Sequence, residues 1–212
     1  MDKNIQIDTF SRFTQVSRET IISLKIYENK LINSNKKLNL IGKSTIDNIW
    51  IRHFLDSAQV IDFIDKKNKT LIDIGSGAGF PGLILGILLK DRKIPFKVKL
   101  LEKSPKKAKF LNDVISELSL DAEVIEKNIF EYSKQLSEDV FVARAFKPLN
   151  IILKLIHNQP INFKKFFIFL GKTGRNELLQ ASKNWNIEYK QRVSVTSNDS
   201  IVIEINRLKK IN

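Results

Sequence analysis

A glycine-rich turn that follows a short apolar segment constrains the fold of this chain more than any other feature. The turn runs from Gly75 to Gly82, directly after the apolar residues Leu71 to Ile74. Pro81 suits the first turn of a helix, and apolar residues continue from 83 to 89. This order of strand, turn and helix places backbone N–H groups at the carboxyl end of a parallel sheet, where ligands bind in open α/β folds.

Alternating strand and helix patterns continue along the chain. Apolar segments at 98–101, 122–125, 140–143, 166–170, 188–195 and 201–205 predict six more strands. Helices are expected near 105–118, with Ser104 and Pro105 at the start, and near 149–157 and 176–185. Only residues 196–200 separate the last two strands, which should form an antiparallel hairpin. The pattern predicts an α/β, Rossmann-like fold with a mostly parallel seven-stranded sheet and an antiparallel edge.

The first part of the chain has a helical pattern instead. Apolar positions up to about residue 34 recur at helical spacing and predict two helices, which a polar break at 33–37 would end. A third helix is expected from Thr45, with Ser44 as its N-cap, toward Ile64. We therefore expect a helical N-terminal extension at residues 1–68, packed on a core at residues 69–212.

Composition narrows the classes of function. The chain has no cysteine and only two histidines, which excludes thiolate metal sites and cysteine nucleophiles and predicts no bound metal. Its 36 Lys and Arg against 23 Asp and Glu give a net charge of +13, which favours a nucleic-acid partner, although an AT-rich genome would supply part of the lysine excess. Its apolar runs are too short to span a bilayer, so we expect a soluble cytoplasmic protein without a membrane partner. We also expect a monomer, although the sequence carries no signal for the oligomeric state.

Two ligands compete for the glycine turn. The spacing Gly77-x-Gly79-x-x-Gly82 matches the fingerprint of an NAD-linked dehydrogenase, with Glu102 as the ribose-binding acid. S-adenosylmethionine needs the same turn and the same acid. Asp73, at the end of the first strand, would repel a pyrophosphate but would suit the ammonium and sulfonium groups of S-adenosylmethionine. The methyl donor is therefore favoured.

The methyl acceptor is constrained by what the chain lacks. Without cysteine, covalent attack on pyrimidine C6 is excluded, and residues 143–148 do not contain the Pro-Pro-aromatic motif typical of enzymes that methylate exocyclic amines. Guanine N7 has a free lone pair, so positioning can drive its methylation without a general base. Arg144 is expected to order the donor or acceptor and Phe146 to stack on a base; alternatively, Arg144 forms a structural ion pair and Phe146 lies in the core.

Two smaller expectations concern charged side chains. Arg52 and Asp56 are four residues apart on the predicted third helix and are expected to pair. A rim that binds RNA phosphates is predicted on the carboxyl side of the sheet, from Lys106, Lys107, Lys172 and Arg175.

Several motifs together resemble one family. They are Asn39-Leu40, the segments 50–57 and 73–82, Leu100 to Glu102, Lys106-Lys107-x-x-Phe110-Leu111, and 143–146. Their order and spacing resemble the GidB (RsmG) family of small-subunit ribosomal RNA guanine-N7 methyltransferases over nearly the whole chain. The resemblance implies a class I S-adenosylmethionine-dependent methyltransferase with a helical N-terminal extension. The implied substrate is nucleotide 527 in the 530 loop of 16S rRNA, either free or in a precursor of the small ribosomal subunit.

The resemblance also bears on individual residues. Combined with the glycine turn, it predicts donor contacts at Asp73, Gly75, Ser76, Gly77, Gly79, Phe80, Glu102, Ile129, Phe130 and Arg144. The chain departs from the family pattern at Gly171-Lys172 and at Asp199-Ser200, on the acceptor side. A methyltransferase for another RNA site, an NAD-linked dehydrogenase and a non-catalytic RNA-binding module remain as alternatives.

Overall fold

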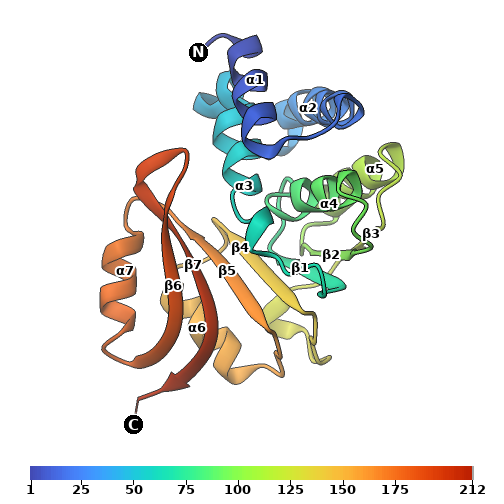
Figure 1. The fold of residues 1–212 in the computed structure, drawn as a ribbon. Helices are drawn as coiled ribbons and strands as arrows, with labels where there is room; N and C mark the ends of the chain where they lie inside the picture. Colours follow the sequence, from blue (N-terminus) through green and yellow to red (C-terminus); the bar gives the residue numbers. More distant parts are fainter. Residues whose placement is uncertain (212) are drawn as a thin grey trace.

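The computed structural model describes residues 1–211, and its centre is a seven-stranded sheet in the order β3-β2-β1-β4-β5-β7-β6 (Figure 1). The strands β1 to β5 are parallel to one another, whereas β7 is antiparallel to both β5 and β6. The predicted mostly parallel sheet with an antiparallel edge is therefore confirmed. The strands are β1 (Thr70–Ile74), β2 (Lys97–Leu101), β3 (Ala122–Ile125), β4 (Val140–Arg144), β5 (Lys165–Leu170), β6 (Trp185–Ser194) and β7 (Ser197–Lys210).

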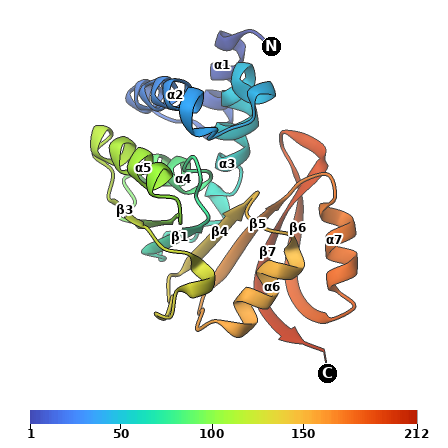
Figure 2. The ribbon, with the colours of Figure 1, turned by 180° about the vertical axis from the view of Figure 1, so that it is seen from behind.

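Side chains of the central strands alternate between two apolar clusters, one on each face of the sheet. In β4, Val140 and Val142 join the cluster under the N-terminal helices, and Phe141 and Ala143 join the opposite one. This alternation is the two-residue period of a strand that is buried on both faces. Helices α4 (Gly82–Asp91) and α5 (Pro105–Glu117) cover the first face. Helices α6 (Leu149–Asn158) and α7 (Gly174–Ala181) cover the second, and α6 lies in front of the sheet in Figure 2.

Two N-terminal helices are present, as predicted, and the second of them packs on α4 and α5. They are α1 (Lys3–Thr14) and α2 (Arg18–Leu38). The predicted polar break at 33–37 is wrong, because α2 continues through it to Leu38. The side chain of Asn35 is buried there: its Oδ1 accepts from the N–H of Ile41 (2.8 Å) and its Nδ2 donates to the carbonyl of Ile41 (3.2 Å). A polar residue that is satisfied in this way does not need to end the helix.

The predicted third α-helix is also wrong in form. The segment is divided into a 3-10 helix η1 (Lys43–Asn48), a π-helical turn η2 (Trp50–Leu55), a short α3 (Asp56–Ala58) and a 3-10 helix η3 (Ile61–Phe63). Ser44 is not the N-cap, because η1 begins at Lys43. Packing explains the irregularity: the ring of Trp50 lies 5.5 Å from Phe10 and 5.1 Å from Phe54 in one aromatic cluster. Irregular helical turns of this kind are often found at functional sites.

The chain's last elements differ from the prediction at their ends. Helix α7 ends at Ala181, and Trp185 begins β6 instead of ending the helix. The indole of Trp185 is buried and donates to Asn150 Oδ1 (3.1 Å), so tertiary packing determines its conformation. The hairpin turn consists of residues 195–196, and β7 already begins at Ser197.

The N-terminal helices and the sheet share one apolar cluster. Phe10, Leu24 and Tyr27 from the helices belong to the same cluster as Leu71 and Val140 from the strands. The division into an extension at 1–68 and a core at 69–212 stays a prediction. Among residues 1–211, no helix is both long and apolar enough to cross a membrane.

Candidate functional site

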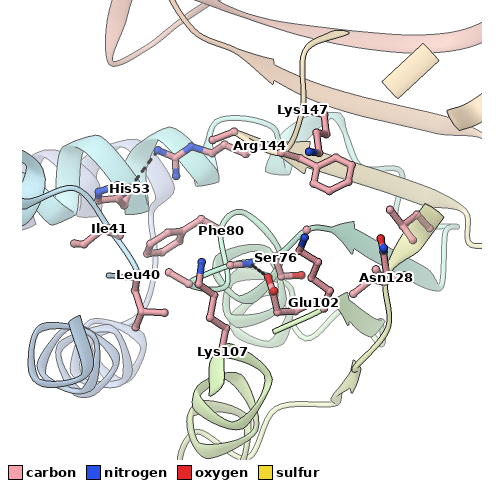
Figure 3. Close-up of a pocket in the computed structure, with 18 of the residues that line it drawn as sticks. Leu40, Ile41, His53, Ser76, Phe80, Glu102, Lys107, Asn128, Arg144 and Lys147 are labelled. Atoms are coloured by element: carbon pink, nitrogen blue, oxygen red, sulfur yellow. Dashed lines mark hydrogen bonds between the residues drawn. The ribbon is translucent and has the colours of Figure 1, made fainter. Parts of the chain in front are cut away.

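A cavity of about 440 Å3 opens where β1, β2 and β4 end (Figure 3). Its floor is the glycine turn between β1 and α4. Its walls are formed by residues that follow β2 and β3 and by residues 144–147 at the end of β4. Residues 40–42, from the chain after α2, close the cavity from above the turn. The cavity therefore lies at the carboxyl edge of the sheet, as the strand–turn–helix pattern predicts.

The turn needs glycine at two closely packed positions. Gly75 has a φ of +74°, and a Cβ there would overlap the ring of Phe146. Gly79 has a φ of +96°, and a Cβ there would lie 2.6 Å from the hydroxyl oxygen of Tyr27. That hydroxyl, fully buried on α2, donates to the carbonyl of Ala78 in the turn. Positive φ values and close neighbours on both sides exclude larger residues at these two positions.

Glu102 lines the cavity at the tip of β2. Its carboxylate accepts from the N–H of Gly77 (2.9 Å, Oε2) and from the N–H of Ser104 (2.8 Å, Oε1). The residue is only 7% exposed. Because each carboxylate oxygen accepts more than one hydrogen bond, Glu102 can still receive a pair of hydroxyl groups from the cavity. The two backbone contacts fix the orientation in which it would do so.

Asp73 does not line the cavity and lies beneath the turn instead. Its Oδ2 accepts from the N–H of Gly82 (2.8 Å), at the start of α4. Its Oδ1 is buried without a hydrogen-bond partner among the described residues. Burial raises the pKa of Asp73 to about 7, although the hydrogen bond from Gly82 opposes the rise. Asp73 is therefore connected to the cavity only through the turn that it supports.

The aromatic residues on the far side of the cavity form a stacked pair. Phe146 lines the cavity, and Phe130 stacks on it with ring centroids 6.0 Å apart and an interplanar angle of 15°. Phe130 is 43% exposed and does not line the cavity. Asn128 and the buried Ile129 complete this side. A flat, largely apolar wall of this kind suits a purine ring.

Residues 40–42, which we call the roof of the cavity, are linked to His53 by a chain of hydrogen bonds. Its Nε2 lies 2.8 Å from Thr45 Oγ1, and Thr45 donates to the carbonyl of Gly42 (2.7 Å). Its Nδ1 lies 3.3 Å from Arg144 Nη2, a donor. The ring therefore accepts at Nδ1 and donates at Nε2. Burial, followed by the charges of Arg144 and Arg52, lowers the pKa of His53 to about 3, so the ring is neutral.

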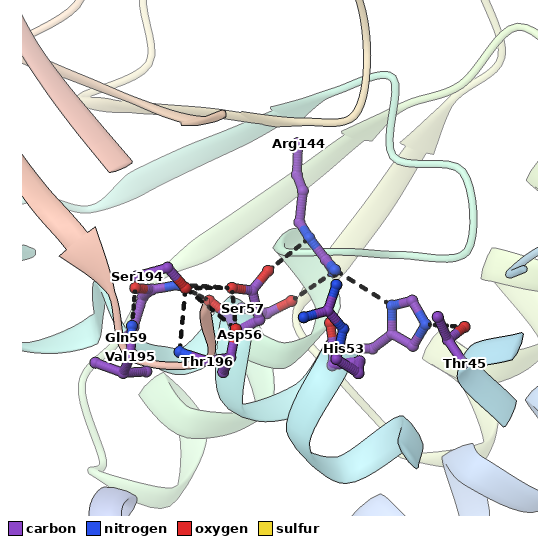
Figure 4. Close-up of polar contacts among 10 residues, drawn as sticks. Thr45, His53, Asp56, Ser57, Gln59, Arg144, Ser194, Val195 and Thr196 are labelled. Atoms are coloured by element: carbon purple, nitrogen blue, oxygen red, sulfur yellow. Dashed lines mark hydrogen bonds and ion pairs between the residues drawn. The ribbon is translucent and has the colours of Figure 1, made fainter. Parts of the chain in front are cut away.

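Arg144 is the centre of a polar network that joins three parts of the chain (Figure 4). Its Nε lies 2.9 Å from Asp56 Oδ2, and its Nη2 donates to the carbonyl of Arg52 (2.7 Å). Asp56 Oδ1 in turn accepts from Ser194 (3.0 Å) and Thr196 (2.9 Å) at the tip of the β6–β7 hairpin. Burial lowers the pKa of Arg144 and the charge of Asp56 opposes this effect. The ion pair expected between Arg52 and Asp56 is wrong, since Asp56 pairs with Arg144 instead.

The chain is similar to known methyltransferases over most of its length. Residues 20–203 match the family model GidB, described as rRNA small subunit methyltransferase G. A relative from Pelagibacter ubique, named ribosomal RNA small subunit methyltransferase G, is 42% identical over 199 residues, or 93% of each chain. The chain belongs to the GidB family. The resemblance drawn from the sequence motifs is thus confirmed.

Solved structures agree with this assignment at the level of the GidB-family fold. The 16S rRNA methylase RmtB gives a TM-score of 0.54 at 14% identity, covering 91% of this chain and 76% of RmtB. TrmK of M. capricolum, solved with S-adenosyl-homocysteine, gives 0.53 at 21% identity, covering 71% of this chain and 66% of TrmK. The expected class I S-adenosylmethionine-dependent methyltransferase fold is therefore confirmed, and the alternative of an NAD-linked dehydrogenase is not favoured.

The structure of this GidB-family chain gathers most of the predicted donor contacts around one cavity. Those that line it are Gly75, Ser76, Gly77, Phe80, Glu102, Ile129 and Arg144, together with Phe146 and Lys107 from the predicted RNA-binding set. Gly79 lies in the turn but, like Asp73 and Phe130, outside the lining. Lys106, Lys172 and Arg175 are exposed and lie outside this cavity as well. The role of each of these residues stays a prediction.

Sequence reasoning missed the roof of the cavity in this GidB-family chain. Leu40, Ile41 and Gly42 line it, and the buried His53 is stacked on Phe80 with ring centroids 5.1 Å apart. One signal was present in the sequence: Asn39-Leu40 is among the family motifs, and Asn39 has a φ of +48°, a conformation that asparagine tolerates better than most residues. That signal indicates a turn but not what the turn covers.

Proposed function

We propose that this chain transfers a methyl group from S-adenosylmethionine to N7 of a guanine in 16S rRNA. We further propose that this guanine is nucleotide 527 of the 530 loop. The observation that carries the proposal is the cavity itself, with Glu102 at the tip of β2 on one side and Arg144 at the tip of β4 on the other. The specific nucleotide follows from the family motifs.

The residues of the cavity fit the methyl donor. Glu102 is oriented by two backbone N–H groups and would receive the ribose hydroxyls. Ile129 and Phe146 would contact the adenine ring, and the bend at Gly75 would admit the amino-acid part of the donor. Asp73 would favour the positive charges of the donor through the turn. When bound, S-adenosylmethionine supplies the electrophilic methyl group.

N7 as the acceptor atom is supported by how the polar side chains are already engaged. Both nitrogens of His53 have partners, Asp56 is paired with Arg144, and Glu102 accepts two backbone hydrogen bonds. N7 needs none of them as a base. Its lone pair attacks the methyl carbon while the carbon–sulfur bond breaks and its electron pair remains on sulfur. The positive charge of the donor passes to the methylated guanine.

The decisive experiment identifies the modified atom and nucleotide. Small ribosomal subunits, their precursors and free 16S rRNA, all from cells that lack the modification, are incubated with the protein and tritiated S-adenosylmethionine. Borohydride and aniline then cleave the RNA at 7-methylguanine, and primer extension locates the break. We expect one break, at nucleotide 527, and no methyl transfer to RNA with 7-deazaguanine at that position.

Other outcomes would assign a different function. Cleavage at another guanine would indicate another RNA site, and labelled RNA without cleavage would contradict N7 as the acceptor. RNA binding with no methyl transfer to any of the three substrates would indicate a non-catalytic RNA-binding module. Calorimetric titration with NAD is the matched control for donor binding, and we expect it to show no heat of binding.

A further inference from the structure

A second, smaller cavity lies beside the donor cavity. Its volume is about 200 Å3, and it shares Arg144 and Ala145 with the donor cavity. Its remaining walls come from η2, from the end of β5 with Gly171, and from the β6–β7 hairpin with Ser200. The two cavities are therefore separated by the end of β4, where a ligand in one would be next to a ligand in the other.

The backbone at the shared boundary is unusual. Ala145 has a φ of +49°, in the left-handed region that residues with a Cβ seldom adopt. Such strain costs free energy and tends to be retained at binding and catalytic sites. Ala145 is exposed, although its neighbour Ala143 in β4 is buried. The strained residue thus places a small side chain where the two cavities meet.

Arg144, which lines both cavities, has one nitrogen whose hydrogen-bonding capacity is incompletely used. Its Nε is paired with Asp56 at 2.9 Å, and its Nη2 donates to the carbonyl of Arg52 at 2.7 Å. These two contacts fix the plane of the guanidinium group. Its Nη1 makes a single long contact, 3.5 Å to Ser57 Oγ, among the described residues. An Nη1 nitrogen carries two hydrogens, so at least one remains for a ligand.

The geometry points to the second cavity as the site of the target guanine base, turned out of the RNA. This inference rests on the proposed function. In guanine, O6 and N7 are neighbouring acceptors on one edge. Arg144 Nη1 would donate to O6 and so hold N7 toward the donor cavity. Adenine presents an amino group in place of O6, so two hydrogen-bond donors, this amino group and Arg144 Nη1, would face each other. The network would then both position guanine and reject adenine.

Filling the cavity tests its occupant. Ser200→Leu places a larger side chain in the second cavity, whereas Ser197→Leu makes the same change on the same strand outside it. We expect Ser200→Leu to lower kcat/KM for RNA by about ten-fold or more, while S-adenosylmethionine affinity measured by calorimetry stays within about two-fold. Ser197→Leu should retain the wild-type values. Equal activity of the two variants would overturn the inference.

A second variant is available for the case in which Ser200→Leu does not fold. Gly171 also lines the cavity, its φ lies outside the left-handed region, and a Cβ there would meet nothing within 4 Å. If Ser200→Leu loses its cooperative thermal transition, Gly171→Leu replaces it in the same comparison. A folded Gly171→Leu protein with wild-type kcat/KM would overturn the inference.

Base analogues test the contact with O6 directly. The target guanine is replaced by 2-aminopurine, which keeps N7 but lacks O6, or by hypoxanthine, which keeps both but lacks the 2-amino group. We expect the methyl-transfer rate with 2-aminopurine to be lower than the rate with hypoxanthine by about ten-fold or more. In the Arg144→Lys variant, the ratio of these two rates should be smaller than in wild type. Equal rates for the two analogues, with guanine still methylated at N7, would refute the O6 contact alone. Failure to methylate guanine at N7 would refute the proposed function and this inference with it.

Discussion

Replacing Asp73 by asparagine tests the buried carboxylate beneath the glycine turn. Asp73 is 0% exposed, and only its Oδ2 has a partner, the N–H of Gly82 at 2.8 Å. Burial raises the pKa of this carboxyl from 3.8 to about 7. Asparagine has the same shape, and its Oδ1 can accept the same hydrogen bond without carrying a charge. The substitution therefore removes the titration while largely preserving the packing.

The sign and size of the effect follow from the pKa. Because the pKa of Asp73 is higher in the folded chain, its contribution to the free energy of unfolding is fully present below pH 3.8 and is lost as the pH rises through about 7. Each pKa unit corresponds to about 1.4 kcal/mol, so the loss between pH 5 and pH 8 is on the order of 2 to 3 kcal/mol. The asparagine side chain of the Asp73→Asn variant does not titrate, so the variant avoids this loss.

Urea denaturation at constant ionic strength measures the difference. We expect the free energy of unfolding of Asp73→Asn, relative to wild type, to rise by about 2–3 kcal/mol from pH 5 to pH 8. The contributions of the other titrating groups to the free energy of unfolding cancel in this difference, because both proteins contain those groups. Asp113→Asn makes the same exchange at an exposed position on α5 and is the control for the loss of one carboxylate. A difference between Asp73→Asn and wild type that does not change with pH would refute the reasoning.

Three further predictions concern catalysis and RNA binding. Arg144→Ala should reduce the methyl-transfer rate about a hundred-fold or more, measured at saturating RNA and donor, because it leaves Asp56 unpaired and the cavity wall disordered. Exchanging Lys106 and Lys107 together for alanine should reduce the slope of log affinity against log salt by about one to two units, as measured by filter binding; an unchanged slope would place the RNA elsewhere. Burial raises the pKa of Asp73 to about 7, so the pH dependence of the rate is measured in the Asp73→Asn background. There the rate at saturating substrates should show no titration of a base between about pH 6 and pH 8, since the pKa of His53 is lowered to about 3. A rate that follows a pKa in that range would contradict catalysis by positioning.

The sheet could be predicted from the sequence because its signals are local. In β4 and β5, nearly every residue is apolar, which is typical of parallel strands buried on both faces. The glycine turn is equally local, since its φ values depend on glycine at fixed positions. The position of the cavity at the carboxyl end of β1 was predictable for the same reason. These local signals predicted a mostly parallel sheet with an antiparallel edge, whereas the order of its strands comes from the structure.

The roof and the Arg144 network could not be predicted from local pattern. Asp56 and Ser194 are 138 residues apart, and Arg144 and Arg52 are 92 apart. The spacing of Arg52 and Asp56 indicated a pair within one helix, but η2 and α3 do not form one regular helix, and Asp56 bonds across to β4 and the hairpin. Where a charged side chain has partners in several elements, tertiary contacts determine which partner it takes.

These long-range contacts connect the N-terminal helices to the cavity at the glycine turn. Tyr27 on α2 donates to Ala78 in the glycine turn, and Asn35 holds Ile41 in the roof. Arg144, at the opposite wall, donates to the carbonyl of Arg52 in η2. A glycine turn is flexible in isolation, since glycine has the widest choice of backbone conformations. Helix α2 limits that choice from one side and Phe146 limits it from the other, so the turn can be preorganised for a ligand only when the extension is packed on the sheet.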